Sequence, residues 1–185
     1  MYVLRHGQSE FNVRFSQNRV DPGIEDPRLT DLGHRQAAEA AEILAQHPIT
    51  RIVASPYTRA LQTATPLAKK LGLPIEIDPL IRERAHFHCD IGTSTRDLRL
   101  AWPGIDFGDL PDRWWPTGSE SDAQLQARCA AFALRLDRAT DWGEVVYVSH
   151  WAFIRGLTGL TVANGTVVEL TPGIRATVVH SPETC

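Results

Sequence analysis

The sequence predicts an α/β protein in which a mostly parallel central sheet is flanked by helices as a three-layer sandwich. Three apolar runs rich in β-branched residues predict buried parallel strands, because such runs are typical of strands covered on both faces. They are Tyr2-Val3-Leu4, Ile52-Val53-Ala54 and Val145-Val146-Tyr147-Val148. Helix signals alternate with strand signals, as in strand–helix–strand crossovers. A polar segment follows each run, at the edge where open α/β sheets bind ligands.

The first half of the chain carries clear signals for where helices begin and end. Ser9 can cap a short helix that runs to about Ser16, and Thr30 can cap a long alanine-rich helix. Pro56 suits the first turn of the next helix, and Gly72 suits its end. A strand is expected over residues 75–77.

The second half begins with a long excursion. Residues 84–120 lose periodicity and contain several glycines and prolines, which predicts a lid-like segment with little regular structure. A helix is then expected over 122–141 and another after the strand at Val145, to about residue 160. Residues 166–170 and 175–179 predict a closing hairpin.

Length, composition and charge limit the classes of protein to consider. The chain has 185 residues, which suits a single domain over 1–185 and is short for two. Its 43% apolar content is ordinary, and no apolar run approaches the roughly 18 residues that span a bilayer. The net charge of −3 gives no basic surface for nucleic acid. We therefore expect no membrane or nucleic-acid partner, and a local cationic site that favours small anionic substrates; the oligomeric state stays open.

The start of the chain and its cysteines favour a cytoplasmic location. The first strand begins at Met1 or Tyr2, with no basic or apolar signal segment ahead of it. Cys89, Cys129 and Cys185 are odd in number and widely spaced. This pattern is typical of reduced thiols and gives neither a disulfide framework nor paired metal ligands.

Two arginines and two histidines lie in the polar segments, and a phosphoryl group is the ligand that they suit. Arg5 and Arg59 offer planar, permanently charged guanidinium groups that can bind two oxygens each. His6 can act as a nucleophile when its imidazole is neutral. His150 begins a helix, where protonation is disfavoured unless an anion compensates.

Four segments, in the same order along the chain, resemble the histidine phosphatase superfamily, also called the phosphoglycerate mutase-like family. They are Arg5-His6-Gly7 with Ser9 and Asn12, Ser55-Pro56 with Arg59-Ala60 and Thr63-Ala64, Ile81-Arg82-Glu83-Arg84, and Ser149-His150. The resemblance spans nearly the whole chain. It implies a phosphoglycerate mutase-like fold and a reaction that needs no metal and no cofactor.

The resemblance also implies a role for each matched residue. His6 would attack phosphorus in line and form a phosphohistidine that water then hydrolyses. Arg5, Arg59 and His150 would bind the phosphoryl oxygens. Glu83 would protonate the leaving alkoxide and then accept a proton from the attacking water. For Glu83 the open alternative is a surface carboxylate paired with a neighbouring arginine.

Two features of the resemblance leave alternatives open. Ser9 and Asn12 match positions around the phosphate, although Ser9 can also act only as a helix cap. After Glu83, the segment Ala85-His86-Phe87-His88-Cys89-Asp90 replaces the usual glycine–aromatic–glycine continuation. We interpret it as a pocket-lining loop; a metal site is the alternative, although the spacing fits no common zinc pattern. Trp114-Trp115 is interpreted as packing that holds the excursion down.

The preferred interpretation is a metal-independent phosphomonoesterase that acts on a small phosphorylated metabolite. A phosphoglycerate mutase would use the same residues but needs a closed pocket that excludes water. A non-catalytic phosphate sensor would keep the anion site without turnover. A nucleotide-binding domain has little support, because no glycine-rich nucleotide motif follows the first strand.

Overall fold

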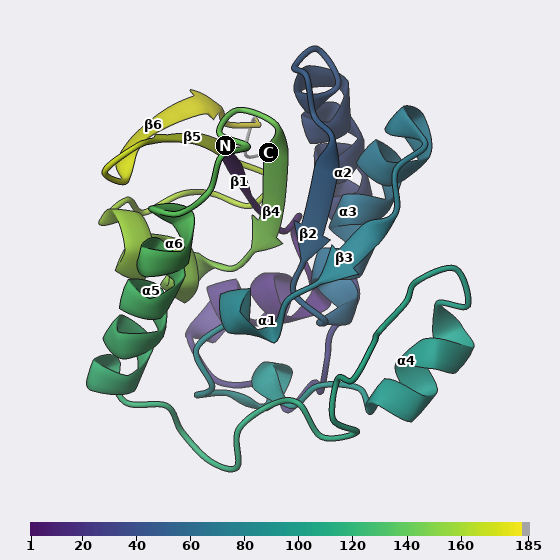
Figure 1. Ribbon diagram of the computed structural model, residues 1–185. Coiled ribbons are helices and arrows are strands. Elements are labelled where there is room, and N and C mark those ends of the chain that lie inside the picture. Colours follow the sequence, from purple (N-terminus) through teal and green to yellow (C-terminus); the bar gives the residue numbers. More distant parts are fainter. Residues whose placement is uncertain (183–185) are drawn as a thin grey trace.

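A computed structural model describes residues 1–182 as a mixed six-stranded sheet with helices on both faces (Figure 1). The strands follow the order β3-β2-β4-β1-β5-β6. Their bounds are β1 (Tyr2–Arg5), β2 (Arg51–Ala54), β3 (Ile75–Ile77), β4 (Val145–Ser149), β5 (Val167–Thr171) and β6 (Arg175–His180). The first four strands in that order are parallel, whereas β5 and β6 add as antiparallel neighbours. The predicted fold class is confirmed.

Helices cover the sheet from both sides, and each side has its own apolar core. The helices are α1 (Glu10–Asn18), α2 (Asp31–Leu44), α3 (Thr58–Leu71), α4 (Thr95–Ala101), α5 (Asp122–Leu136) and α6 (Trp151–Thr158), with short 3-10 helices η1 (Pro79–Ile81) and η2 (His88–Asp90). Along β1, Tyr2 and Leu4 pack toward α2 and α3, whereas Val3 packs toward α5 and α6. This alternation explains the continuous apolar run, because both faces of the strand are buried.

Two predicted helix ends differ from the structure. The helix capped by Ser9 continues past Ser16 to Asn18, and Arg19 closes it with a φ of 60°. The helix predicted over 122–141 ends at Leu136, which is its last buried side chain. Beyond that point the chain is no longer helical, although Ala139 and Trp142 still pack against the same core.

The excursion at 84–120 holds more regular structure than predicted, since it contains η2 and α4. The hydroxyl of Ser94 caps α4 by accepting a hydrogen bond from the backbone N–H of Asp97 at 3.1 Å. Leu98 is fully buried and packs with the core on the α2 and α3 side. The expectation of little regular structure is therefore wrong for this part of the excursion.

Trp114 anchors the excursion to the body of the protein. Its indole N–H donates to the carbonyl of Thr93 at 2.9 Å, and its ring meets Tyr57 edge-on at 4.6 Å between centroids. Trp115 packs edge-on against Trp114 at 5.5 Å. These contacts match the packing interpretation of the tryptophan pair.

Two further observations bear on location and cysteine chemistry. Among the helices of residues 1–182, none has both the length and the apolar character needed to cross a membrane. Cys89 and Cys129 are buried free thiols, whereas Cys185 lies outside the described residues. The cytoplasmic location and the single-domain organisation stay predictions.

Candidate active site

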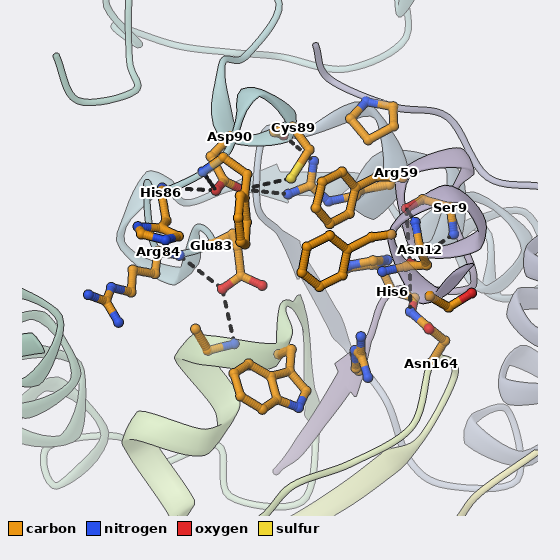
Figure 2. Close-up of a pocket in the computed structure, with 18 of the residues that line it drawn as sticks. His6, Ser9, Asn12, Arg59, Glu83, Arg84, His86, Cys89, Asp90 and Asn164 are labelled. Atoms are coloured by element: carbon orange, nitrogen blue, oxygen red, sulfur yellow. Dashed lines mark hydrogen bonds and ion pairs between the residues drawn. The ribbon is translucent and has the colours of Figure 1, made fainter. Parts of the chain in front are cut away.

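A cavity of about 550 Å³ lies at the carboxyl edge of the parallel strands (Figure 2). Because β4 pairs with both β1 and β2, the residues that follow these three strands come together at this edge. They are His6, Ser55 and His150. The cavity itself is lined by six of the seven predicted site residues, namely Arg5, His6, Ser9, Asn12, Arg59 and Glu83. The seventh, His150, lies behind His6, with 5.1 Å between the two ring centroids.

His6 is buried, with 3% of its surface exposed. Its Nδ1 lies 2.7 Å from the carbonyl oxygen of Gly7. Because a carbonyl oxygen only accepts, Nδ1 carries the proton and Nε2 keeps its lone pair. Burial, reinforced by the positive charges of Arg59 and Arg5, holds the pKa of His6 well below its usual range. The ring is therefore a neutral imidazole with a free Nε2.

The loop that follows His6 packs too closely on α2 to tolerate a side chain. A Cβ on Gly7 would lie 2.3 Å from the carbonyl oxygen of Gly33. The Gly7 N–H donates to Oγ1 of Thr63 at 3.1 Å, and Thr63 donates in turn to the carbonyl of Arg59 at 2.7 Å. Thr63 thus links the loop that carries His6 to the helix that carries Arg59.

Arg59 lies in the first turn of α3 and is 2% exposed. Its Nη1 donates to the carbonyl of Cys89 at 2.8 Å, and its Nη2 lies 3.4 Å from Oδ1 of Asp90. Its guanidinium carbon lies 4.2 Å from the ring centroid of Tyr57. The helix dipole opposes a cation at this end of a helix, and the buried carboxylate of Asp90 compensates for that cost.

Two buried nitrogens here, Nε of Arg5 and Nδ1 of His150, have no hydrogen-bond partner among the described residues. Nη1 of Arg5 donates to the carbonyl of Val162 at 2.5 Å. Burial lowers the pKa of Arg5 to about 10, so the group stays protonated at neutral pH. Nε2 of His150 lies 2.8 Å from Oγ of Ser55. Buried polar nitrogens without a partner are costly in free energy.

Glu83 follows η1 and points into the cavity from the side opposite His6 and Arg59 (Figure 2). Its Oε1 accepts hydrogen bonds from the backbone N–H of Ala152 at 3.0 Å and of Arg84 at 2.9 Å. Its Oε2 accepts none within residues 1–182. Burial raises the pKa of Glu83, and this effect outweighs the nearby cations. A carboxyl with a raised pKa is suited to donate a proton.

The neighbouring arginines pair elsewhere. Nη2 of Arg82 lies 3.3 Å from Oε1 of Glu120, and Nη1 of Arg84 lies 2.6 Å from Oδ1 of Asp122. Glu83 therefore does not form the surface ion pair with Arg82 or Arg84 that was the alternative interpretation.

Ser9 and Asn12 combine a capping role with a place in the cavity wall. Oδ1 of Asn12 accepts from the backbone N–H of Ser9 at 3.0 Å, and Oγ of Ser9 caps α1. The same Oδ1 accepts from Nδ2 of Asn164 at 3.2 Å, and Nδ2 of Asn164 also donates to the carbonyl of His6 at 3.1 Å. Asn164 was missed by the sequence reasoning, since its only local mark is the turn signal Asn164-Gly165.

The histidine-rich segment of the excursion forms part of the cavity wall. Nδ1 of His88 lies 3.0 Å from Oδ2 of Asp21. Oδ2 of Asp90 accepts the backbone N–H groups of His86 and Phe87, both at 3.0 Å. Within residues 1–182, no group of three or more His, Cys, Asp or Glu side chains is arranged to hold a metal ion. Asp90, considered from sequence only as a ligand, is thus a partner of the excursion backbone and of Arg59.

Three phenylalanines form an aromatic wall in the lining of the cavity. Phe11 and Phe15 come from α1 and Phe87 comes from the excursion, and their ring centroids lie 5.1 to 5.5 Å apart. The guanidinium carbon of Arg19 lies 5.7 Å from the ring centroid of Phe15. Trp151 lines the cavity as well. The cavity therefore offers apolar ring faces together with a cation.

Comparison with known proteins identifies the family to which the chain belongs. Residues 1–169 match the family model of the histidine phosphatase superfamily (branch 1). The glucosyl-3-phosphoglycerate phosphatase of Mycolicibacterium vanbaalenii is 35% identical, over 91% of this chain and 78% of that protein. The protein of the same name from Mycobacterium tuberculosis is 32% identical, over 89% and 77%.

Solved structures share the fold. A mycobacterial glucosyl-3-phosphoglycerate phosphatase in complex with VO3 has a TM-score of 0.67 at 26% identity, covering 100% of this chain and 99% of that one. Phosphoserine phosphatase of Entamoeba histolytica, in complex with 3-phosphoglyceric acid, has a TM-score of 0.65 at 21% identity, covering 99% and 96%. The predicted phosphoglycerate mutase-like fold is confirmed. The chain belongs to branch 1 of the histidine phosphatase superfamily, the family that its sequence resembles.

Proposed function

We propose that this protein hydrolyses phosphomonoesters of small metabolites through a phosphohistidine formed on Nε2 of His6. The observation that carries the proposal is the neutral His6, whose Nδ1 proton is bound to Gly7 and whose Nε2 is free, placed among buried guanidinium groups. Membership of the family and the phosphatase names of the relatives support the same reaction.

In the first step, Nε2 of His6 attacks phosphorus and the bond between phosphorus and the alcohol oxygen breaks. Arg5 and Arg59 hold the phosphoryl oxygens, and Nδ1 of His150 gains a partner for its proton. The proton of Glu83 goes to the leaving alkoxide. The products are phosphohistidine, a Glu83 carboxylate and the free alcohol.

In the second step, water attacks phosphorus and the bond to His6 breaks. The Glu83 carboxylate takes the proton of the attacking water, so the enzyme returns to its starting state and phosphate is released. We propose that Ser9 and Asn12 line the phosphate and also keep the nucleophile loop in place through Asn164.

The opposite pKa shifts of the two reacting groups make this sequence workable. The first step needs His6 neutral and Glu83 protonated. With ordinary pKa values of about 6.5 for histidine and about 4.3 for glutamate, the two states would hardly coexist at any pH. Burial lowers the pKa of His6 and raises that of Glu83, and both shifts increase the fraction of the protein in which His6 is neutral while Glu83 is protonated.

The aromatic wall favours a substrate whose alcohol carries a ring or another extended apolar face. The cavity of about 550 Å³ is within the usual size range of small-molecule sites and far exceeds a bare phosphate. Glucosyl-3-phosphoglycerate, the substrate in the relatives' name, has a sugar ring and a carboxylate beside its phosphate. We propose a substrate of this class, with its ring on Phe15 and Phe87 and its carboxylate near Arg19.

The experiment measures phosphate release from an aryl phosphate and from glucosyl-3-phosphoglycerate in excess chelator, between pH 5 and 8. We expect turnover by the wild type and by His34→Ala, an exposed control on α2. We expect no turnover by His6→Ala. When the wild type is quenched rapidly during turnover of a radioactive phosphate ester, we expect radioactive phosphate to remain attached to the protein. Turnover that persists in His6→Ala, or that chelator abolishes, would exclude the proposed route.

A further inference from the structure

The segment that carries Glu83 has no regular secondary structure to hold it. Residues 82–87 lie outside the helices and strands, between η1 and η2. A proton donor must nevertheless stay within hydrogen-bond reach of the leaving oxygen, and small displacements of catalytic groups are costly. Other contacts must therefore fix the main chain at this point.

Arg128 of α5 binds this main chain from behind. Its side chain is 8% exposed. Nη1 donates to the carbonyl oxygens of Leu80 at 2.9 Å and Arg82 at 2.7 Å, and Nη2 lies 3.4 Å from the carbonyl of Glu83 itself. Carbonyls at the end of a short helix lack partners within that helix, and a guanidinium group provides several donors in a fixed plane.

Glu120 completes the arrangement at the end of the excursion. Its carboxylate accepts both Nε and Nη2 of Arg128, at 2.9 and 2.7 Å, and it lies 3.3 Å from Nη2 of Arg82. Its backbone N–H donates to the carbonyl of Ala85 at 2.7 Å, and its backbone carbonyl accepts Nε of Arg84 at 2.8 Å. Glu120 is thus bonded to residues on both sides of Glu83.

The burial of this ion pair points to a geometric role. Glu120 is 5% exposed, so both partners have lost most of their contact with water. Such pairs seldom stabilise a fold more than apolar residues of the same volume would, because desolvation offsets the attraction. What apolar residues could not supply is the set of hydrogen bonds to the main chain around Glu83.

We propose that Arg128 and Glu120 are positioning residues that hold the main chain of residues 80–85 and thereby keep the Glu83 carboxyl at the leaving oxygen of the substrate. This inference rests on the proposed function, in which Glu83 donates the proton. It assigns a role in the reaction to two side chains that are absent from the lining of the cavity.

The test uses the leaving group as its readout. An alkyl phosphate needs a proton donor for its alkoxide, whereas a nitrophenyl phosphate leaves as a stable phenolate and does not. Arg128→Lys keeps the charge but loses the planar set of donors. We expect kcat/KM to fall roughly 10- to 100-fold for the alkyl phosphate and less than about threefold for the nitrophenyl phosphate. Arg138→Lys, an exposed position beyond the end of α5, should leave both values unchanged.

A double-mutant cycle tests whether Arg128 acts through Glu83. In a Glu83→Gln background, which already lacks the proton donor, Arg128→Lys should cause no further loss with the alkyl phosphate. Equal losses for both substrates, or fully multiplicative losses in the cycle, would show that Arg128 only supports the fold and would overturn the proposal.

A second variant covers the case in which Arg128→Lys does not fold. Glu120→Gln with Arg128→Met removes both charges of this ion pair together, and the amide oxygen of the glutamine can still accept a hydrogen bond from Nη2 of Arg82. We expect this double variant to show the same selective loss of kcat/KM with the alkyl phosphate. A ratio of the kcat/KM values for the two substrates that equals the wild-type ratio would overturn the proposal. Failure of this proposal can be distinguished from failure of the proposed function. If the proposed function were wrong, the His6→Ala variant would still hydrolyse the nitrophenyl phosphate as fast as the wild type.

Discussion

The two sides of the cavity are held in different ways. Arg5 ends the central strand β1 and His6 follows it, and Arg59 lies in the first turn of α3, a helix that packs on the sheet. Glu83 and Phe87 stand instead on a segment without regular structure, which is held by the side chain of Arg128 from α5 and by that of Asp90 in η2. The phosphate-binding side therefore follows from the fold, whereas the side that meets the alcohol depends on individual contacts.

This difference suggests a division of labour. In the proposed reaction the strand ends bind and transfer the phosphoryl group whatever the alcohol, since every phosphomonoester presents the same oxygens. In the proposed reaction Glu83 protonates the alcohol oxygen, and we expect the neighbouring excursion to decide which alcohol fits. Loops placed on a rigid scaffold commonly carry such specificity. Changes on the first side should therefore affect all substrates, and changes on the second side should affect them selectively.

The largest expected effect is that of Arg59→Lys. Lysine keeps the charge but loses the planar donors, so we expect kcat/KM to fall about 10³-fold for alkyl and aryl phosphates alike. Steady-state kinetics on both substrates will check this, with Arg175→Lys, an exposed position on β6, as the matched control. A loss confined to one substrate would contradict the assignment of Arg59 to the common phosphate.

Trp114→Ala tests how the excursion is anchored. The substitution leaves a cavity beside Tyr57 and removes the hydrogen bond to Thr93, so we expect the free energy of unfolding to fall by about 3 kcal/mol. Denaturant titration measures this change. Trp114→Phe keeps most of the packing and should cost only about 1 kcal/mol, for the lost hydrogen bond. Equal costs for the two variants would show that ring packing is not the anchor.

The pH dependence separates the two sides of the cavity. Because the pKa of Glu83 is raised, kcat/KM for an alkyl phosphate should stay high above the usual glutamate range and fall as the pH passes the raised value. Glu83→Gln should remove this alkaline limb and lower the plateau about 100-fold. Because the wild type and Glu83→Gln are measured with the same substrate, ionisation of the substrate affects both pH profiles equally and does not alter their difference. An alkaline limb that survives in Glu83→Gln would assign it to another group.

Sequence patterns located the residues of the first side of the cavity and, through the family resemblance, Glu83 on the second side, but not the contacts that hold the second side in place. His6 and His150 could be located because each follows a buried β-branched run, and parallel strands bring their carboxyl ends to one edge. The pairings of Asp90 with Arg59 and of Glu120 with Arg128 span irregular segments. No period in the sequence specifies such contacts.

The missed helix α4 shows where a local signal was available. Its seven residues lie between Gly92 and Pro103, and this composition favoured an irregular interpretation. Ser94 and Asp97, however, have the spacing of a capping pair at a helix start, and the structure confirms that cap. Short helices in glycine- and proline-rich stretches are better found from their caps than from their periodicity.

The smallest expected effect concerns Asp26, the residue that joins the two sides. Its Oδ1 accepts the backbone N–H of Thr58 at the start of α3, and its Oδ2 accepts the hydroxyls of Thr58 and Thr93 at 2.7 and 2.6 Å. Asp26→Asn leaves one oxygen for these donors, so we expect a loss of about 1 kcal/mol in the free energy of unfolding. Asp109→Asn, at an exposed position of the excursion, should change it by less than about 0.5 kcal/mol.

If Asp26 also keeps the excursion in register with α3, then Asp26→Asn should lower kcat/KM more for an alkyl phosphate than for a nitrophenyl phosphate. An equal change in both would mean that Asp26 stabilises the start of α3 without adjusting the side of the cavity that carries Glu83.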